Sequence, residues 1–345
     1  ARARAPASAG GLRGPLSAAS PVYSRAFAAH RRREETVEVI RGMHNLRPRH
    51  RGCVATIGNF DGVHRGHRMI LDRLRSLAAE AGVPATLVTF EPQPREFFEG
   101  REVPARLTRL REKLCLLREA GLERVLLLPF NERLAALSAQ AVVDDILVAG
   151  LGVRHLLVGD DFRFGRGREG DFALLARAGR EAGFAVEHLP TLEDDGERIS
   201  SSRVRNALAA GDLALAERLL GHPYFVMGRV TYGRQLGRQL GVPTANVPLH
   251  RYRAALEGVF AVEVDGLGPR RPGVANIGVR PTVEGREPLL EVHLFDYAGE
   301  CYGALLTTFF RGKIRDEWKF DSLDALKAQI ARDAEAARSL LGVAP

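Results

Sequence analysis

Short apolar runs alternate with longer amphipathic stretches in the first half of the chain. Four runs have the length of β-strands: CVATI (53–57), ATLVTF (85–90), RVLLLPF (124–130) and HLLVG (155–159). Between them, apolar residues recur at helical spacing over 69–82, 106–121 and 138–152. Gly82, Gly121 and Gly152 stand where helix C-caps belong. This alternation predicts an α/β domain, with a parallel sheet and helices on both faces.

The pattern changes after residue 221. Strand-like segments follow one another closely and are separated by Gly, Pro and Asn: FVMGRVT, GVFAVEV, GVANIG, LLEVHLFD and LLTTFF. They predict an antiparallel barrel or sandwich. A final helix is expected over 322–341, with Ser322 as its N-cap. A helical stretch at 202–221 leads to the boundary, so we predict domains at 37–221 and 222–345.

Charge is distributed unevenly along the 345 residues. The net charge is +8, but residues 1–36 contain seven arginines and only two acids. This segment lacks hydrophobic periodicity, so we predict a disordered basic extension over 1–36. It fits upstream sequence translated from a misassigned start, an organelle transit peptide, or a binding arm. Because the charge is concentrated there, the basic composition is poor support for nucleic-acid binding.

Composition places the rest of the chain among globular proteins. Hydrophobic residues make up 45% and charged residues 27%. The sequence contains no run of roughly 18 continuous apolar residues, so it predicts no transmembrane helix. Cys53, Cys115 and Cys301 are far apart and lack metal-ligand spacing. They fit buried thiols in a reducing compartment, so we expect a cytoplasmic protein.

The segment GNFDGVHRGH (58–67) follows the first predicted strand. Ligands of open α/β sheets bind at the carboxyl ends of strands, and a helix N-terminus there attracts phosphate. His64 and His67 are three residues apart, so they project from one face of the helix expected to begin near His64. Gly66 keeps the surface between them low. The arrangement favours phosphate chemistry, with a metal pair or two surface histidines as alternatives.

A second polar segment, ISSSRVR (199–205), enters a helix about 135 residues later. Ser201 and Ser202 offer hydroxyl groups and Arg205 offers a forked donor to phosphates. The alternative for this segment alone is a serine N-cap on a basic helix. HxGH followed by this segment within one α/β unit resembles the HxGH nucleotidyltransferase superfamily, which has a Rossmann-like fold.

Two loops indicate which family within this superfamily the chain resembles. TFEPQPREFF (89–98) and VGDDFRFGRGREGD (158–171) each follow a strand, and each alone could be a structured loop. With TIGNFDGVHRGH and ISSSRVR in this order, they resemble bacterial FAD synthetase, which moves AMP from ATP to FMN and releases pyrophosphate. The family often begins near Val37, which favours the misassigned start. The resemblance implies ATP contacts from Gly58, Asn59, Phe60, Asp61, His64, His67, Ser201, Ser202 and Arg205, and flavin contacts from Phe90, Pro92, Asp160, Asp161 and Phe162.

In the second half, VTYGRQLGRQLGVPTANVP (230–248) combines a glycine-punctuated basic loop with PTAN. The Thr244 hydroxyl and Asn246 carbonyl are hard oxygen ligands that suit Mg²⁺ beside phosphates. A β-hairpin with a proline turn is the alternative. In LLEVHLFD (289–296), Glu291 and His293 share one strand face. Glu291 is either a solvated carboxylate or a base that deprotonates a hydroxyl group.

These segments resemble riboflavin kinase, a six-stranded antiparallel barrel that uses ATP and Mg²⁺. The resemblance implies that Thr244 and Asn246 hold the metal and that Glu291 is the catalytic base. KIRDEWKF (313–320) matches a segment near the flavin, which makes Arg315 a flavin contact. Trp318 there is either exposed or covers the flavin ring. The implied ATP-binding residues of this half are Gly233, Gly237, Arg238, Pro243, Thr244 and Asn246.

Together, the two halves predict a bifunctional enzyme that converts riboflavin to FMN and FMN to FAD. Its expected partners are ATP, riboflavin and FMN, without nucleic acid or membrane, and its oligomeric state is open. An HxGH enzyme acting on pantetheine phosphate or nicotinamide mononucleotide would lack the PTAN barrel. A nucleic-acid-binding protein would show basic residues with interleaved aromatics over its folded domains. Here aromatics are 7% and the excess charge lies in 1–36.

Overall fold

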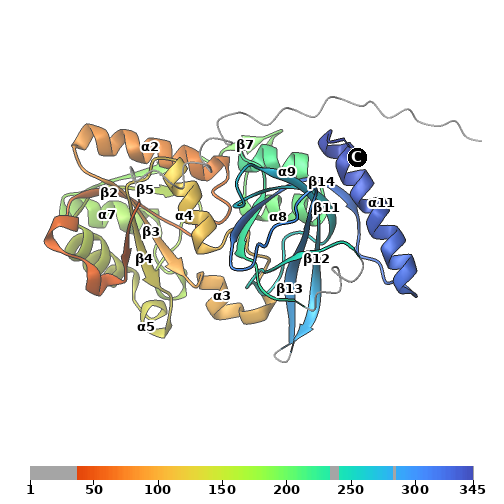
Figure 1. Ribbon diagram of the computed structural model, residues 1–345. Coiled ribbons are helices and arrows are strands. Elements are labelled where there is room, and N and C mark those ends of the chain that lie inside the picture. Colours follow the sequence, from red (N-terminus) through yellow and green to blue (C-terminus); the bar gives the residue numbers. More distant parts are fainter. Residues whose placement is uncertain (1–36, 234–240, 283–284, 345) are drawn as a thin grey trace, which may run out of the picture. The chain divides into compact units, whose positions relative to one another are not determined.

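The computed structural model describes residues 37–233, 241–282 and 285–344 (Figure 1). All of the described residues belong to one compact unit. The extension predicted over 1–36 therefore lies outside the described residues, as do Gly237 and Arg238. Within the described part, no helix combines the length and apolar character that crossing a membrane requires.

The first half is built on a six-stranded sheet, and its strands all run parallel as predicted. Their order is β1-β4-β3-β2-β5-β6. The four predicted strands occupy its centre, where both faces are buried and the sequence is continuously apolar. The edge strands β1 and β6 were not predicted, because they are short and carry charged residues. The bounds are β1 Glu38–Arg41, β2 Cys53–Ile57, β3 Ala85–Glu91, β4 Arg124–Pro129, β5 Val153–Gly159 and β6 Ala185–Leu189.

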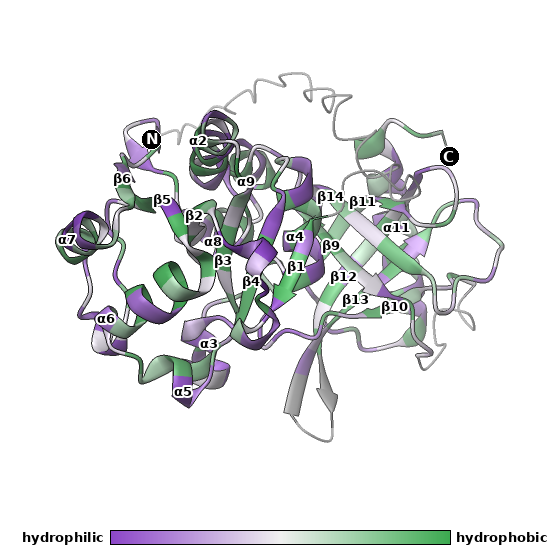
Figure 2. Cartoon of the chain, turned by 90° about the vertical axis from the view of Figure 1, so that its left-hand side faces the viewer, coloured by the Kyte–Doolittle hydropathy of each residue, from purple (hydrophilic) through white to green (hydrophobic). Residues whose placement is uncertain are grey.

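Amphipathic helices cover this sheet. In Figure 2, α2 and α7 carry both hydrophilic and hydrophobic residues, as expected for helices between a core and water. The predicted stretch 138–152 forms a short helix followed by a π-helix. The helical and 3₁₀ segments of this half are η2 Met43–Asn45, η3 Pro48–His50, α2 Arg65–Ala81, α3 Pro94–Glu99, η4 Gly100–Glu102, α4 Leu110–Glu119, α5 Glu132–Ala135, α6 Ala139–Ala141, the π-helix Val142–Leu151, η6 Arg166–Arg168 and α7 Phe172–Ala182.

The junction between the halves contains a small hairpin and two helices. Strands β7 (Glu193–Asp194) and β8 (Glu197–Arg198) precede α8 (Ser201–Ala209) and α9 (Leu213–Leu220). The single helical stretch expected over 202–221 is therefore interrupted, because Gly211 takes a positive φ of 77° and Asp212 caps α9. The buried faces of α8 and α9 share one hydrophobic cluster with the second half. The boundary at 221 stays a prediction.

The second half is an antiparallel six-stranded sheet in the order β10-β13-β12-β11-β14-β9. A bridge between Thr231 and Asn246 brings the two ends of this order together, so the sheet is a nearly closed barrel and not a sandwich. Helix α11 (Leu323–Leu341) lies against it, with Ser322 as N-cap as predicted. The strands are β9 Phe225–Arg229, β10 Ala245–Pro248, β11 Gly258–Asp265, β12 Arg271–Thr282, β13 Gly285–Leu294 and β14 Leu305–Arg315.

Candidate active sites

The HxGH segment forms a strained turn between β2 and α2. Phe60 and Val63 have φ of 48° and 42°, which is unusual for residues with a side chain. His64 is the N-cap of α2, as its Nδ1 accepts a hydrogen bond from the His67 N–H at 3.3 Å. The two imidazole rings stack with centroids 3.7 Å apart. The turn thus presents both rings at a helix N-terminus, as the spacing predicts.

His64 is buried, His67 is half-buried, and both imidazoles are held neutral. Burial lowers the pKa of His64 to about 4, and Arg198 and Arg205 act in the same direction against the opposing effect of Asp61. Burial and the adjacent His64 hold the pKa of His67 well below its usual value. An anion placed beside these rings would raise both pKa values. The two neutral imidazoles can therefore become protonated when an anion binds beside them.

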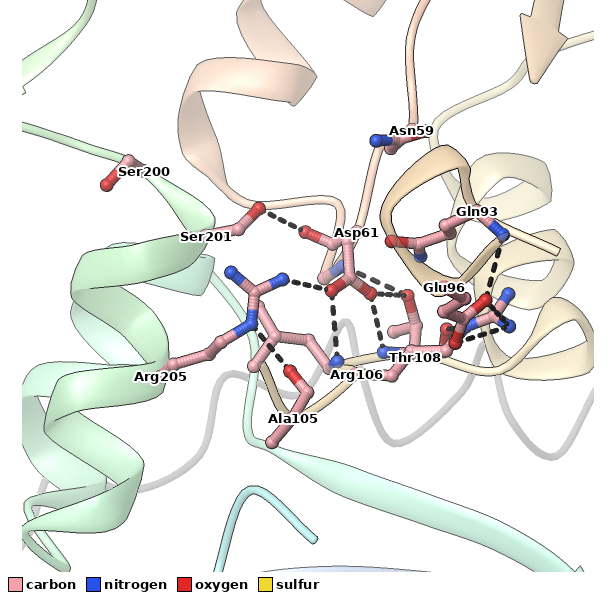
Figure 3. Close-up of polar contacts among 12 residues, drawn as sticks. Asn59, Asp61, Gln93, Glu96, Ala105, Arg106, Thr108, Ser200, Ser201 and Arg205 are labelled. Atoms are coloured by element: carbon pink, nitrogen blue, oxygen red, sulfur yellow. Dashed lines mark hydrogen bonds and ion pairs between the residues drawn. The ribbon is translucent and has the colours of Figure 1, made fainter. Parts of the chain in front are cut away.

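Asp61 is the centre of a buried polar cluster beneath the turn (Figure 3). Its carboxylate accepts hydrogen bonds from the N–H groups of Leu107 and Thr108, at 3.1 and 2.9 Å. It also pairs with Arg205 at 2.6 Å, and its backbone oxygen accepts from Ser201 Oγ at 2.9 Å. Burial by itself raises the pKa of Asp61, but Arg205 and other donors outweigh it and hold the pKa below its usual value.

Arg205, which is predicted to contact phosphate, is already bound to other groups of the protein. Its guanidinium also donates to the Ala105 carbonyl, so it joins the Asp61 cluster to α8. The N-cap of α8 is Ser200, whose Oγ accepts from the Arg203 N–H at 3.2 Å. The alternative of a serine N-cap is therefore confirmed for this segment. A role of Arg205 and the neighbouring serines in ATP binding stays a prediction.

A cavity of about 260 Å³ opens beside the two histidines. It brings together predicted residues from three motifs: Gly58, Phe60, His64, His67, Asp160, Asp161, Phe162 and Ser201. Other predicted residues lie outside its lining: Asn59, Asp61, Phe90, Pro92, Ser202 and Arg205. The buried Asn59 Oδ1 has no hydrogen-bond partner among the described residues. Phe90 packs edge-on against Phe130 at 5.7 Å, so its flavin role stays a prediction.

Two cations near this cavity were missed by the sequence reasoning. Arg198 lines it and pairs with Asp161 at 2.9 Å. It stands directly before the ISSSRVR segment, so its position in the sequence could have indicated it. Lys113 lies on α4 with a fully buried side chain, and its charge influences Asp61 and His67. Its only signal is a lysine on the apolar face of a predicted helix.

A second cavity, of about 390 Å³, lies in the barrel and against α11. It is lined by Thr244, Glu291 and Arg315, three predicted residues from widely separated segments. Glu291 lies on β13, paired in register with Asn246 on β10 and with Asn276 on β12. Its carboxylate is half-buried and lines the cavity with His293, as the strand alternation predicts. This position supports a role of Glu291 in the cavity over the alternative of a solvated carboxylate on the strand surface.

The surroundings of Asn246 suit a hard cation. Asn246 Oδ1 is buried without a hydrogen-bond partner in the described part of the chain. A Cβ on Gly233 would lie 2.5 Å from the Asn246 amide nitrogen, so only glycine leaves this side chain its space. Pro243 is beside the site, and its carbonyl oxygen lies 2.9 Å from His293 Nδ1. A free amide oxygen next to Thr244 fits Mg²⁺ coordination.

Arg315 is fixed in the barrel cavity by α11. Its Nε and Nη2 lie 3.0 and 2.7 Å from the carboxylate of Asp333, which is 4% exposed. The guanidinium also stands 4.9 Å from the Trp318 ring. Trp318 lines the cavity and is 57% exposed. Of the two expectations for Trp318, exposure is confirmed, while covering of a flavin ring stays a prediction.

Comparisons with known proteins agree with this division into two sites. The FAD synthetase family model matches residues 46–203, and the riboflavin kinase family model matches residues 220–341. A bifunctional riboflavin kinase/FMN adenylyltransferase of Pseudomonas fluorescens is 59% identical over 88% of this chain and 98% of its own length. The enzyme of the same name from Escherichia coli K12 is 55% identical over 89% of this chain and 99% of its own.

A solved structure has the same architecture. The crystal structure described as a macrolide-efflux protein from Streptococcus pneumoniae superposes with a TM-score of 0.73 at 28% identity. The match covers 88% of this chain and 99% of that one, so the α/β unit and the barrel occur together in both. From the two family models and the two close relatives, we conclude that this chain belongs to the bifunctional riboflavin kinase/FMN adenylyltransferase family.

Proposed function

We propose that this chain catalyses two consecutive steps of flavin cofactor synthesis. The barrel phosphorylates riboflavin with ATP to give FMN, and the α/β unit transfers AMP from a second ATP to FMN, giving FAD and pyrophosphate. The observation that carries this proposal is the presence of two separate cavities, each lined by some of the residues from one family's motifs. Both activities are transferases, and the product of the first is the substrate of the second.

The adenylyl transfer needs positioning and charge stabilisation. The FMN phosphate has a second pKa of about 6, so at neutral pH it is already a nucleophile without a base. Its oxygen attacks the α-phosphorus of ATP, and pyrophosphate leaves. His64 and His67 lie at the positive end of α2, and we assign to them the stabilisation of the negative charge that builds on the phosphates. Because both imidazoles start neutral, they gain a proton or share one as that charge develops.

The kinase step needs a base, because the riboflavin hydroxyl is not ionised at neutral pH. Glu291 lines the barrel cavity, and it is the carboxylate to which the resemblance assigns this role. Thr244 Oγ1 and Asn246 Oδ1 would hold Mg²⁺, which neutralises phosphate charge when bound. Arg315 and Trp318 lie on the side of the cavity that we assign to the flavin.

The partners we propose are ATP, riboflavin and FMN, with neither nucleic acid nor membrane. The three cysteines are free thiols, and Cys53 and Cys115 are buried. This is compatible with the cytoplasmic location that we expect, because a reducing compartment keeps thiols free.

Product analysis by chromatography tests the function directly. The full-length chain is incubated with ATP and Mg²⁺, first with riboflavin and then with FMN. We expect riboflavin to yield FMN and then FAD, and FMN to yield FAD. FAD from FMN with riboflavin untouched would refute the kinase assignment, and no turnover of either flavin would refute both.

Two matched variants separate the sites. His67→Ala is expected to lower FAD formation by about 100-fold and to leave FMN formation intact, because its ring lies at the first cavity only. Glu291→Gln is expected to lower FMN formation by about 100-fold and to leave FAD formation from supplied FMN intact. Equal loss of both activities in either variant would contradict the assignment of separate sites.

A further inference from the structure

Residues of the kinase half contact the turn that carries the catalytic histidines. We use "kinase half" for residues 220–341 and "FAD synthetase half" for 46–203, the two matched segments. His222, which is 3% exposed, lies with its Nε2 3.1 Å from the Gly62 carbonyl oxygen. Gly62 precedes His64 by two residues. The second ring nitrogen of His222 is 2.9 Å from the carbonyl oxygen of its neighbour Pro223, and the neutral ring has one N–H to donate to one of these two carbonyls.

Arg251 makes a second contact, and it is more extensive. This arginine of the kinase half donates through Nη1 to the carbonyls of Arg106 and Leu107, at 2.9 and 3.2 Å. Its Nη2 pairs with Glu112, and both side chains are almost wholly excluded from water, at 1% and 0% exposure. The other Glu112 oxygen accepts the Met227 N–H of β9 at 2.8 Å. The pair thus connects α4 of one half with the barrel of the other.

The peptide segment held by Arg251 is the one that holds Asp61. Its carbonyls at Arg106 and Leu107 face Arg251, while its N–H groups at Leu107 and Thr108 face the Asp61 carboxylate. The hydroxyl of Thr108 also accepts the Gly62 N–H at 2.9 Å. A short chain of hydrogen bonds therefore runs from Arg251 through this segment to Asp61 and Gly62, which lie three and two residues before His64.

Helix α8 adds a third connection between the halves. Its first residue, Ser201, bonds the Asp61 backbone oxygen. Its apolar side chains Val204, Ala207 and Leu208 belong to the same buried cluster as the barrel residues. The end of α8 that touches the catalytic turn is thus seated on the kinase half as well.

We propose that the kinase half completes the adenylyl-transfer site, with Arg251 and His222 as positioning residues for the turn from Asp61 to His64. FAD formation therefore depends on Arg251, whereas FMN formation does not, because Arg251 is not part of the lining of the barrel cavity. The inference rests on the proposed adenylyl transfer at the HxGH turn. It adds that a residue outside the matched FAD synthetase segment sets the rate of that step.

The test compares both activities in the full-length chain. Arg251→Met alone leaves Glu112 as an unpaired buried charge, so a second variant, Arg251→Met with Glu112→Leu, replaces the pair by apolar residues of similar size. In this double variant, we expect FAD formation from FMN to fall about tenfold or more in kcat. FMN formation from riboflavin, measured on the same preparation, should stay within about twofold and reports that the protein is folded.

Arg253→Met is the matched control. Arg253 also pairs across the halves, with Glu102 at 3.0 Å, but both side chains are mostly exposed, at 53% and 85%. Exposed pairs contribute little, so both activities should stay within about twofold of wild type. Glu291→Gln is a second control. It should stop FMN formation while FAD formation continues, which shows that the dependence runs through contacts and not through kinase turnover.

A double-mutant cycle with Asp61→Asn separates positioning from general stability. If Arg251 acts through Asp61, adding the Arg251→Met/Glu112→Leu pair to Asp61→Asn should lower FAD formation by less than about twofold further. His222→Gln, which keeps a donor for the Gly62 carbonyl, should retain more FAD formation than His222→Leu.

Three results would overturn the inference. They are unchanged FAD formation in the Arg251→Met/Glu112→Leu variant, an equal fall of both activities, and fully multiplicative effects with Asp61→Asn. Wild-type protein that makes FMN but no FAD would instead overturn the proposed adenylyl transfer itself.

Discussion

Lys113 is a charged residue with no counterpart in the motifs. Its side chain on α4 is fully buried, and its Nζ has no hydrogen-bond partner among the described residues. Burial lowers the pKa of Lys113 from 10.5 to about 8, and Arg106 acts in the same direction while Asp61 opposes it. Between these pH values the unfolded chain binds a proton that the folded chain has released. The charge therefore costs stability below pH 8, and this cost fades as the pH rises to 10.5.

Lys113→Met should therefore stabilise the protein in a pH-dependent way. The variant keeps the length of the side chain and removes the buried charge. We expect the free energy of unfolding to rise by about 3 kcal/mol at pH 7, with a gain that shrinks steadily between pH 8 and 10.5. Urea denaturation of the wild type and the variant at several pH values measures this difference. Lys327→Met, at an exposed position of α11, is the control. An equal gain at pH 7 and pH 10 would contradict the buried charge as the cause.

The site residues that sequence analysis reached are those whose chemistry is visible in a short motif. His64 and His67 share a cavity, and Thr244 and Glu291 share another. Lys113 and Arg251 could not be found in this way, because their surroundings are created by segments far away in the chain. Glu112 and Arg251, for example, are 139 residues apart and meet only in the folded protein. No local pattern distinguishes Arg251 from the exposed Arg253.

At the level of elements, apolar patterning predicted the central strands and the long helices, and the differences have local causes. The stretch 106–121 becomes helical only from Leu110, because the N–H groups of Leu107 and Thr108 bond to Asp61. The short strand β10 was not recognised, because it begins within PTAN, at Ala245. These deviations occur where backbone groups serve a site, and there the local pattern gives no signal.

Helix α11 provides a prediction at this scale, because it fixes a cavity residue from outside the barrel. Asp333 accepts three hydrogen bonds from Arg315, and Gln329 supports Asp333 at 2.8 Å. Asp333→Asn removes the charge that holds Arg315 while keeping the shape. We expect kcat/KM for riboflavin phosphorylation to fall about tenfold, with FAD formation from FMN unchanged.

The comparison for this variant is Glu335→Gln, an exposed acid on the same helix, which should leave both activities unchanged. Steady-state kinetics with riboflavin and with FMN measure the two effects separately. Wild-type riboflavin kinetics in Asp333→Asn would show that α11 does not position Arg315 for the reaction.

At the scale of the whole molecule, two buried histidines, His64 and His222, lie at the contacts between the halves. Burial lowers the pKa values of both His64 and His222 to about 4, the charge of His222 acts on His64, and His222 Nε2 lies 3.1 Å from the Gly62 carbonyl oxygen. A group whose folded pKa lies below its unfolded value binds more protons when unfolded, so stability is lost as the pH falls from 6.5 towards 4. Glu119 acts in the opposite sense, as burial raises its pKa to about 7. Acid should therefore weaken the junction, and we expect the barrel cavity, whose lining includes neither His64 nor His222, to be less affected.

His64→Gln isolates one of these histidines. Between pH 7 and pH 4, the wild type should lose about 3 kcal/mol more of its free energy of unfolding than the variant, because the glutamine has no proton to gain. Taking this difference cancels the contribution of Glu119, which both proteins share. Denaturant unfolding at each pH gives the values, and parallel acid curves for the two proteins would exclude His64 as a source of acid sensitivity. In the wild type, FAD formation should also be lost at a higher pH than FMN formation, since the protonated histidines belong to the turn to which we assign adenylyl transfer.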